Sequence, residues 1–234
     1  MSKKKIGIII GSIIGLVVMW FLYKAFLLYM YYPISWDSFD YNKSLGDIEI
    51  SHVETTGSKT SRLGASFVLP EGFTFDKEKT DKSEPNTMVY SDTLDRVIIT
   101  YFGKSDLSGR LKDVRRGINV SKVLKNNQVS SMVDVMKYLD QHQKSKVTFL
   151  SSLKDIQTQY VMVMLTMMSL PNGEHYYITG DYDGYLIQQK NTMLLYLLHG
   201  HMVYEFSFYN PSKDVTTKFT QADIVKFASM ITFE

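Results

Sequence analysis

The longest hydrophobic pattern in the chain lies at its N-terminus. Residues 6–23 carry no charged side chain, and Ser12 is their one polar residue apart from tyrosine and tryptophan. A run of this length reaches the lower limit for an α-helix that crosses a hydrocarbon core of about 30 Å. Lys24 interrupts the apolar pattern, but a long lysine stem at the end of a span can extend to the interface. The pattern predicts a transmembrane anchor over residues 6–28.

Basic and aromatic residues flank this anchor at opposite ends. The basic tail, residues 1–5, favours a cytoplasmic N-terminus and an outward C-terminal domain. Aromatic rings with a polar edge favour the headgroup region, and they are concentrated at the far end of the anchor. The residues predicted to lie at the two membrane interfaces are Lys3, Lys4, Lys5, Trp20, Tyr23, Lys24, Tyr31 and Tyr32.

A cleavable secretory signal is the main alternative to a permanent anchor. Such a signal has a shorter apolar region and ends at a cleavage site of small residues. Here residues 27–32 are large and apolar or aromatic, with no A-x-A pattern, and the chain has no cysteine for a lipid anchor. The sequence therefore predicts a plasma-membrane protein with a single uncleaved span.

Three glycines lie on one face of the predicted span. Gly7, Gly11 and Gly15 repeat every four residues, a spacing that lets two membrane helices approach closely. Glycine is also common in membrane spans that make no such contact. The spacing therefore permits, but does not require, association with another membrane helix through these glycines. The expected surroundings of the span are the lipid bilayer.

The pattern changes after the anchor. Residues 29–46 have no clear period and are interpreted as a juxtamembrane stalk, and residues 47–234 are expected to form one extracytoplasmic domain. Alternating or continuous apolar runs bounded by turn residues predict β-strands, with an antiparallel meander in the C-terminal third. The predicted strands cover residues 47–53, 65–69, 87–91, 96–102, 160–168, 175–179, 185–189, 193–198 and 202–209.

Two segments have the period of amphipathic helices. Ser131 and Thr220 each precede an apolar stripe and are followed three residues later by aspartate, the pattern of an N-terminal capping box. The first helix is expected to end near His142, and a weaker helical segment covers residues 111–125. The predicted fold is α+β: an N-terminal transmembrane helix followed by an antiparallel sheet flanked by two or three helices.

Composition adds two constraints. Four of the 26 basic residues and none of the 24 acidic ones precede Ser35, which leaves 22 basic and 24 acidic residues in the rest of the chain. This balance gives no electrostatic argument for binding nucleic acid. The absence of cysteine excludes disulfides and thiol chemistry. An outward-facing domain without disulfides is more typical of a bacterial cell surface than of a eukaryotic one.

No motif in the sequence indicates a specific catalytic chemistry. The common serine-hydrolase, phosphate-loop and zinc-protease patterns are absent. His199 and His201 could share a metal ion on one strand, but Gly200 between them is more typical of a hairpin tip. Residues 180–184 carry two carboxylates, yet the spacing of a calcium loop is incomplete, and a tight turn fits better. No metal, cofactor or catalytic residue is predicted.

Two stretches are similar to a known family. Residues 67–73, F-V-L-P-E-G-F, resemble the F-x-L-P-x-G-W opening of domains with the PsbP/Mog1-like fold, although Phe73 stands where tryptophan is usual. The aromatic strand 204–208 and the ending 228–233 resemble the close of the same domains. The resemblance implies an antiparallel sheet flanked by helices, and a binding or assembly role without a shared active site.

Together these patterns predict a non-enzymatic, single-span membrane protein whose extracytoplasmic domain binds a protein partner or supports a membrane-bound assembly. An immunity protein that captures a toxin at the membrane is one variant. The competing hypothesis is a membrane-tethered hydrolase, which a deep pocket with converging His, Asp or Glu side chains would favour. In a third hypothesis the span itself is the active part and pairs with another membrane helix.

Overall fold

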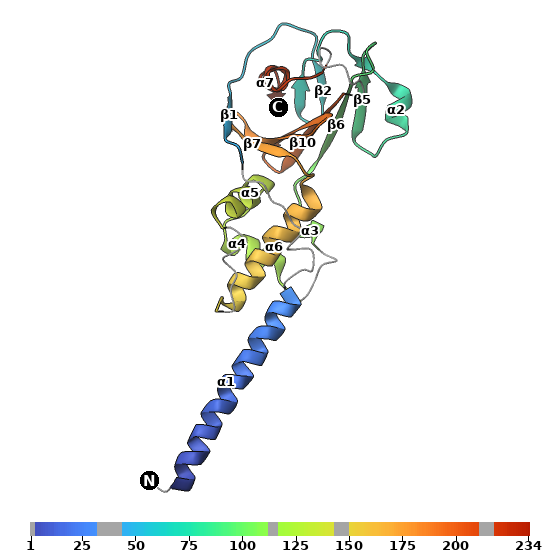
Figure 1. Ribbon diagram of the computed structural model, residues 1–234. Helices are drawn as coiled ribbons and strands as arrows, with labels where there is room; N and C mark the ends of the chain where they lie inside the picture. Colours follow the sequence, from blue (N-terminus) through green and yellow to red (C-terminus); the bar gives the residue numbers. More distant parts are fainter. Residues whose placement is uncertain (1–2, 32–43, 112–116, 143–149, 211–217) are drawn as a thin grey trace. The chain divides into compact units, whose positions relative to one another are not determined.

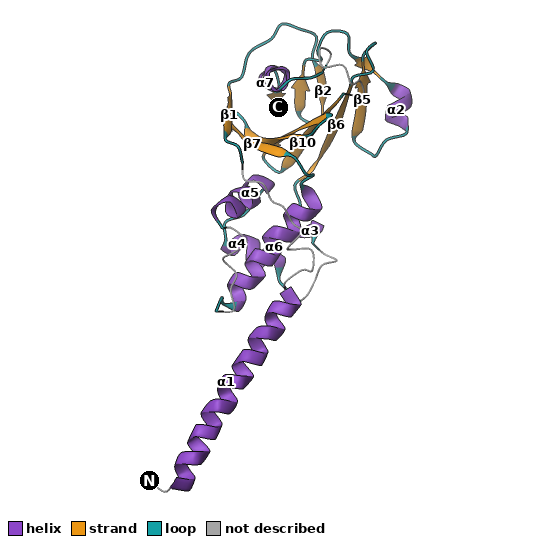
Figure 2. Cartoon of the chain, viewed as in Figure 1, coloured by secondary structure: helices purple, strands orange, loops and turns teal. Residues whose placement is uncertain are grey.

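The computed structural model describes residues 3–31, 44–111, 117–142, 150–210 and 218–234, without the side chains of residues 3–8 and 110. The chain divides into two compact units (Figure 1). The helical unit comprises Met1–Tyr41 and Leu107–Leu170, and the sheet unit comprises Asn42–Asp106 and Pro171–Glu234. One large sheet together with helices confirms the predicted α+β class (Figure 2).

The described part of the sheet unit contains two β-sheets and two helices. The larger sheet has the strand order β1-β7-β8-β9-β10-β6-β5-β4, and the smaller has the order β11-β3-β2. The strands of the larger sheet are β1 (Asp47–Ile50), β4 (Thr74–Phe75), β5 (Thr87–Ser91), β6 (Val97–Lys104), β7 (Glu174–Gly180), β8 (Asp183–Gln188), β9 (Thr192–His199) and β10 (Met202–Tyr209). The remaining elements are β2 (Thr60–Arg62), β3 (Ala65–Phe67), β11 (Thr232–Phe233), α2 (Lys77–Asp81) and α7 (Gln221–Ser229).

Most strands of the larger sheet agree with the apolar pattern. The meander from β7 to β10 pairs antiparallel throughout. β5 and β6, which match the predicted strands 87–91 and 96–102, form a hairpin. One pairing corrects the prediction of an antiparallel sheet: β1 lies parallel to β7, with Ile48 beside Ile178, so the sheet is mixed. The pattern did not predict β2, β4 or α2, because each spans only two to five residues.

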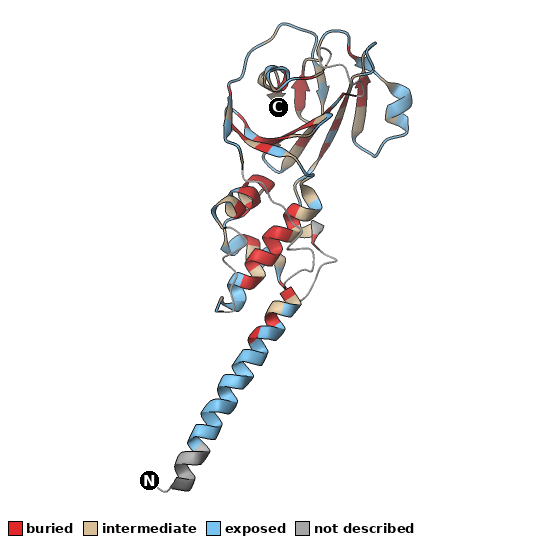
Figure 3. Cartoon of the chain, viewed as in Figure 1, coloured by how far each residue is buried: buried red, intermediate tan, exposed pale blue. Residues whose placement is uncertain are grey.

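A layer of aromatic side chains forms the core of the sheet unit. Alternate residues of β10 are buried, and α7 lies over one face of the larger sheet (Figures 1 and 3). Phe67 of β3 is fully buried, with its ring centroid 5.5 Å from that of Phe206, 5.7 Å from Phe227 and 6.4 Å from Phe102. Edge-on contacts of this kind add to the free energy gained by burying the rings. Phe67 therefore joins β3, the larger sheet and α7.

The helical unit consists, in its described residues, of one long helix and four shorter ones. They are α1 (Lys3–Tyr31), α3 (Leu107–Arg110), α4 (Val120–Asn126), α5 (Met132–Gln141) and α6 (Leu153–Ser169). α6 contacts each of the other four helices. After the span, the described residues contain six helices where two or three were predicted. α2, α3 and α6 were not expected, whereas α5 and α7 match the capping-box segments and α4 lies in the weaker segment over residues 111–125. Residues 112–116 of that segment lie outside the described residues.

The prediction of a central strand over residues 160–168 is wrong, because these residues lie in α6. They are apolar on every side, a pattern that fits a strand covered on both faces or a helix surrounded by other helices. The local signal that distinguishes a helix from a strand here lies just before these residues, at Ser152 and Asp155. Ser152 Oγ accepts a hydrogen bond from Asp155 N at 3.1 Å, and Asp155 Oδ2 accepts one from Ser152 N at 3.2 Å, which is a helix capping box. The predicted capping boxes at Ser131 and Thr220 are both confirmed.

α1 continues without a break from the basic tail through the predicted span. Residues Ile9–Tyr31 are long and apolar enough to cross a membrane, and only 11% of their apolar window is buried (Figure 3). The buried positions are near the end of the helix, at Lys24, Leu27 and Tyr31. The predicted stalk begins inside this helix, and its residues 32–43 lie outside the described residues.

The aromatic core predicts unequal effects for two phenylalanine truncations. Phe67→Ala should lower the free energy of unfolding of the full-length protein in detergent micelles by about 3–5 kcal/mol, because it leaves a cavity among four buried rings. Phe75→Ala provides the matched control, since this side chain is 48% exposed, and it should cost less than about 1 kcal/mol. Equal losses of unfolding free energy for the two variants in denaturant titrations would contradict the conclusion that Phe67 is central to the core.

Candidate functional site

The sheet unit contains a cavity of about 310 Å³ beside the aromatic core. Its walls come from residues 68–71 after β3, from Arg96 at the start of β6, from Phe208 of β10, and from residues 219–230 in and around α7. Cavities of this size accept a small ligand or a side chain of a partner. We name this cavity the Arg96 pocket, because Arg96 is its most strongly positioned polar residue.

Two neighbouring aromatic rings lie next to the Arg96 guanidinium. The Arg96 Cζ atom lies 5.3 Å from the centroid of the Phe73 ring and 5.2 Å from that of Phe219. The two rings are 5.6 Å apart, and Phe219 also lies 5.2 Å from Phe208. A guanidinium over an aromatic face is attracted by the ring quadrupole. Phe73 and Phe219 therefore restrict Arg96, and Phe219 and Phe208 also form an apolar wall of the pocket.

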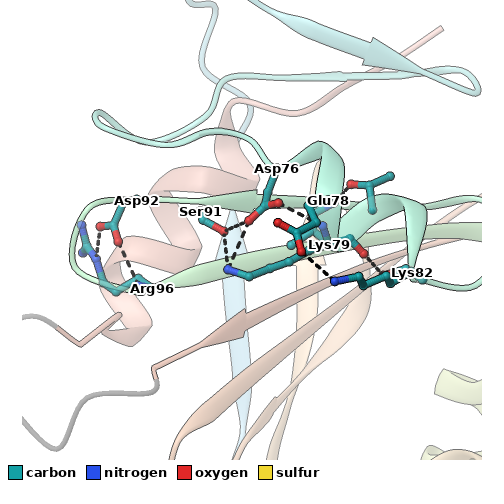
Figure 4. A network of polar contacts seen from close by, with 10 residues as sticks. Asp76, Glu78, Lys79, Lys82, Ser91, Asp92 and Arg96 are labelled. Atoms are coloured by element: carbon teal, nitrogen blue, oxygen red, sulfur yellow. Dashed lines mark hydrogen bonds and ion pairs between the residues drawn. The ribbon is translucent and has the colours of Figure 1, made fainter.

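Asp92 fixes the same guanidinium from the β5–β6 turn (Figure 4). Arg96 Nε donates to Asp92 Oδ2 at 2.7 Å, and Asp92 Oδ1 accepts from the backbone N–H groups of Leu94 and Arg96 at 3.0 and 2.9 Å. The Asp92 side chain is only 4% exposed. Asp95 closes this turn with a positive φ of 58°, a conformation that aspartate tolerates better than bulkier residues do. The turn thus sets the position of Arg96 through its side chain and its backbone.

The electrostatic state of Asp92 follows from these contacts. Burial acts to raise the pKa of the Asp92 carboxyl, but hydrogen bonds from the side chain and backbone of Arg96 and from the backbone of Leu94 outweigh it and hold this pKa below its usual range. A carboxylate that receives several hydrogen bonds stays ionised at neutral pH. Asp92 is therefore a permanent anionic support for Arg96.

Part of the positive charge at the pocket has no partner within the described residues. Arg96 uses Nε for Asp92, and its two terminal nitrogens make no hydrogen bond to any part of the chain that the structure describes. Lys226 is exposed at the pocket, and its ammonium group likewise has no ion pair among those residues. Of the two acidic lining residues, Asp223 already accepts hydrogen bonds from Thr220 N and Oγ1, both at 2.7 Å. Glu71 is exposed.

This arrangement can bind an anionic ligand. A guanidinium with its terminal nitrogens available can bind a carboxylate or phosphate through two parallel hydrogen bonds. The neighbouring rings can bury an apolar group. Among the described residues, the polar side chains of the lining are those of Glu71, Arg96, Asp223 and Lys226. Its chemistry favours an anionic group attached to an apolar one.

A second polar cluster, around Tyr182, has a structural role. His52 Nδ1 lies 2.8 Å from Tyr182 Oη, which donates to the carbonyl oxygen of Ile231 at 2.6 Å. Burial, with a smaller contribution from the Asp181 carboxylate, raises the pKa of Tyr182 to about 12. The phenol therefore stays protonated and holds the C-terminal segment.

The predicted membrane-interface residues differ in how exposed their side chains are. Trp20 and Tyr23 are exposed along α1, at 41% and 51%. Lys24 and Tyr31 are buried, and Lys24 Nζ donates to the Ser151 carbonyl oxygen rather than extending into solvent. The predicted residues whose side chains lie outside the described part of the chain are Lys3, Lys4, Lys5 and Tyr32.

The glycine face of α1 has open space beside it. A methyl group added at Gly11 or Gly15 would meet no described atom within 4 Å. Gly7 lies in α1, but its surroundings are outside the described residues. Helix pairing through these residues remains a prediction.

The two histidines of the candidate metal site occupy a hairpin tip. Gly200 has a positive φ of 58° between β9 and β10, which confirms the predicted turn. The His199 ring stacks on Phe233 with centroids 4.6 Å apart, whereas His201 is exposed. Among the described residues, no three His, Cys, Asp or Glu side chains are grouped closely enough to hold a metal ion.

No pattern in the sequence connects Arg96 with this pocket. The one local signal is the Asp92-x-x-x-Arg96 spacing across a predicted turn, and it does not identify Phe219 as the second ring. Comparison with known proteins adds no candidate role: no protein-family model matches the chain, and no curated protein matches it. The site must therefore be interpreted from its own geometry.

Replacing Asp92 tests how Arg96 is held. Asp92→Asn should lower the free energy of unfolding by about 1–3 kcal/mol near pH 7, because it removes the charged acceptor of a nearly buried hydrogen-bond set. The folded-state pKa of Asp92 lies below its unfolded value, so this stabilisation is present above pH about 4 and is lost as the pH falls through the folded pKa. The difference between wild type and variant should therefore shrink below that pH.

Asp95→Asn in the same turn is the matched control. The Asp95 side chain is exposed, and asparagine also tolerates positive φ, so this variant should unfold like the wild type. A loss at Asp95 as large as that at Asp92, or a loss at Asp92 that persists unchanged into acid, would show that the carboxylate does not support Arg96.

Proposed function

We propose that the protein is a non-enzymatic, single-span membrane protein whose extracytoplasmic sheet unit binds a protein partner through the Arg96 pocket. α1 would anchor it in the plasma membrane with a cytoplasmic N-terminus. The bound feature of the partner would be an apolar side chain next to a carboxylate. The observation that carries the proposal is the Arg96 guanidinium, which Phe73, Phe219 and Asp92 position with its terminal nitrogens available to a ligand.

The anchor is supported by α1 and its flanks. Residues Ile9–Tyr31 of this helix have the length and apolarity of a membrane span, and Lys3, Lys4 and Lys5 precede that span. Lysine and arginine are enriched on the cytoplasmic side of such spans, which favours this orientation. Recruiting a partner to the membrane requires an anchor and a binding surface. In the proposed role, α1 is the anchor and the Arg96 pocket is the binding surface.

The binding role is supported by pre-organisation. A flexible arginine loses conformational entropy when it binds an anion, and this loss reduces the affinity. Arg96 already loses much of that freedom in the folded protein, because Phe73, Phe219 and Asp92 hold it. The resemblance of residues 67–73 and 204–233 to PsbP-like domains, which implies a binding or assembly role, agrees with this proposal.

Site-specific photo-crosslinking of the full-length protein in its native membrane tests the proposal. A photoreactive residue in place of exposed Lys226 should capture one dominant protein, whereas the same residue in place of Lys82 should not. Lys82 is the matched position because it is an exposed lysine directly after α2, outside the pocket. Equal capture at both positions would locate the partner elsewhere.

A second substitution connects the capture to Arg96. Arg96→Met, which retains an unbranched stem but no charge, should reduce capture at position 226 by about tenfold or more, since a charge-assisted hydrogen bond contributes about 1.5–3 kcal/mol. Arg62→Met removes an arginine outside the pocket lining and should leave capture unchanged. Undiminished capture by the Arg96 variant would exclude the pocket as the binding site.

A further inference from the structure

We propose that residues 150–154, at the start of α6, form a second membrane contact in the headgroup region of the bilayer that α1 crosses. This inference rests on the anchoring part of the proposed function and is independent of the Arg96 pocket. Its partner is a lipid surface, and the observations that support it all lie within the helical unit.

Two sets of contacts place the start of α6 relative to α1. Lys24 Nζ donates to the carbonyl oxygen of Ser151. Further along both helices, Gln157 Nε2 donates to Tyr31 Oη at 3.3 Å, and the rings of Tyr31 and Tyr160 are 6.0 Å apart. The last two turns of α1 and the first turns of α6 therefore run side by side in the same direction. Residue 151 lies at the level of Lys24.

The level of Lys24 corresponds to the edge of the hydrocarbon core. A span of about 20 residues at 1.5 Å per residue crosses about 30 Å, and it ends next to Lys24 when counted from Ile6 and about one helical turn later, at Leu28, when counted from Ile9. Trp20 and Tyr23 are exposed just before this point, where amphipathic rings favour the headgroups. The start of α6 is therefore at the same depth as the aromatic end of the span.

The residues at the start of α6 have the chemistry that this depth requires. Leu150 is 78% exposed and Leu153 is 36% exposed, and Lys154 is exposed beside them. Apolar side chains with an adjacent basic residue are typical of segments that lie in the membrane interface. The neighbouring Asp155 carboxylate is engaged by Ser152 N and Oγ at 3.2 and 2.7 Å, and it lies in the first helical turn, where negative charge is stabilised. Single exposed leucines are common on protein surfaces, but these two flank the residue that binds Lys24.

The contact also accounts for the buried lysine in α1. An ammonium group at the edge of the hydrocarbon core needs hydrogen-bond acceptors. Ser151 supplies a carbonyl oxygen, and the Trp20 ring lies 5.8 Å from Lys24 Nζ. The hydrogen bond to Lys24 thereby holds residues 150–154 at a depth where Leu150 and Leu153 can enter the membrane interface.

The absence of cysteine from the chain permits a depth measurement with single introduced cysteines. Full-length Leu150→Cys, Leu153→Cys, Met168→Cys and Val17→Cys would each be labelled with an environment-sensitive fluorophore. They would be reconstituted in vesicles of phosphatidylcholine and phosphatidylglycerol that contain nitroxide-labelled lipid. Met168 is the matched control, because it is 51% exposed and lies about 22 Å further along α6, at 1.5 Å per residue. Val17 reports on the span itself.

The expected pattern separates this inference from the anchor. Labels at 150 and 153 should be quenched at least about twofold more than the label at 168 by a nitroxide near the headgroup end of the acyl chain. The label at 17 should be quenched most by a nitroxide near the middle of the chain. Quenching at 17 with none above the control at 150 and 153 would overturn the second contact alone. No quenching at 17 would overturn the anchor and the second contact together, while leaving the Arg96 pocket untouched.

Discussion

The aromatic layer around Phe67 is the contact on which the sheet unit depends. It joins β3 and α7 to the larger sheet through rings less than about 6.5 Å apart, and burial of such rings is the main favourable contribution to folding. The Arg96 pocket lies beside this layer and uses two of its rings, Phe208 and Phe227, as walls. The packing that stabilises the sheet unit thus also shapes its candidate site.

Charged residues determine which polar groups this apolar site can bind. Asp92 receives three hydrogen bonds in a tight turn and stays ionised, so it can hold Arg96 Nε while the terminal nitrogens remain available. Phe73 and Phe219 restrict the guanidinium further. In the helical unit, Lys24 and Ser151 make a comparable connection between the anchor and α6. In both places, neighbouring residues fix the position of one cation beside apolar side chains.

The parts of the fold that depend on local chemistry could be predicted from the sequence, and the parts that depend on distant contacts could not. Ser131 and Thr220 identify their helices because a capping box involves only four neighbouring residues. Residues 160–168 were misassigned because an all-round apolar run does not show whether sheets or helices surround it. Arg96 was missed for the same reason: its role depends on Phe73 and Phe219, which lie 146 residues apart in sequence.

The central claim is that Arg96 binds a carboxylate next to an apolar group. The most direct measurement follows the NMR signals of the Arg96 guanidinium, assigned through Arg96→Lys, while N-acetyl-phenylalanine or its neutral amide is added to the full-length protein in micelles. The account predicts saturable shifts of the Arg96 signals with the acid and much smaller shifts with the amide, because only the carboxylate accepts two charge-assisted hydrogen bonds. Equal shifts with both compounds, or none with either, would contradict it.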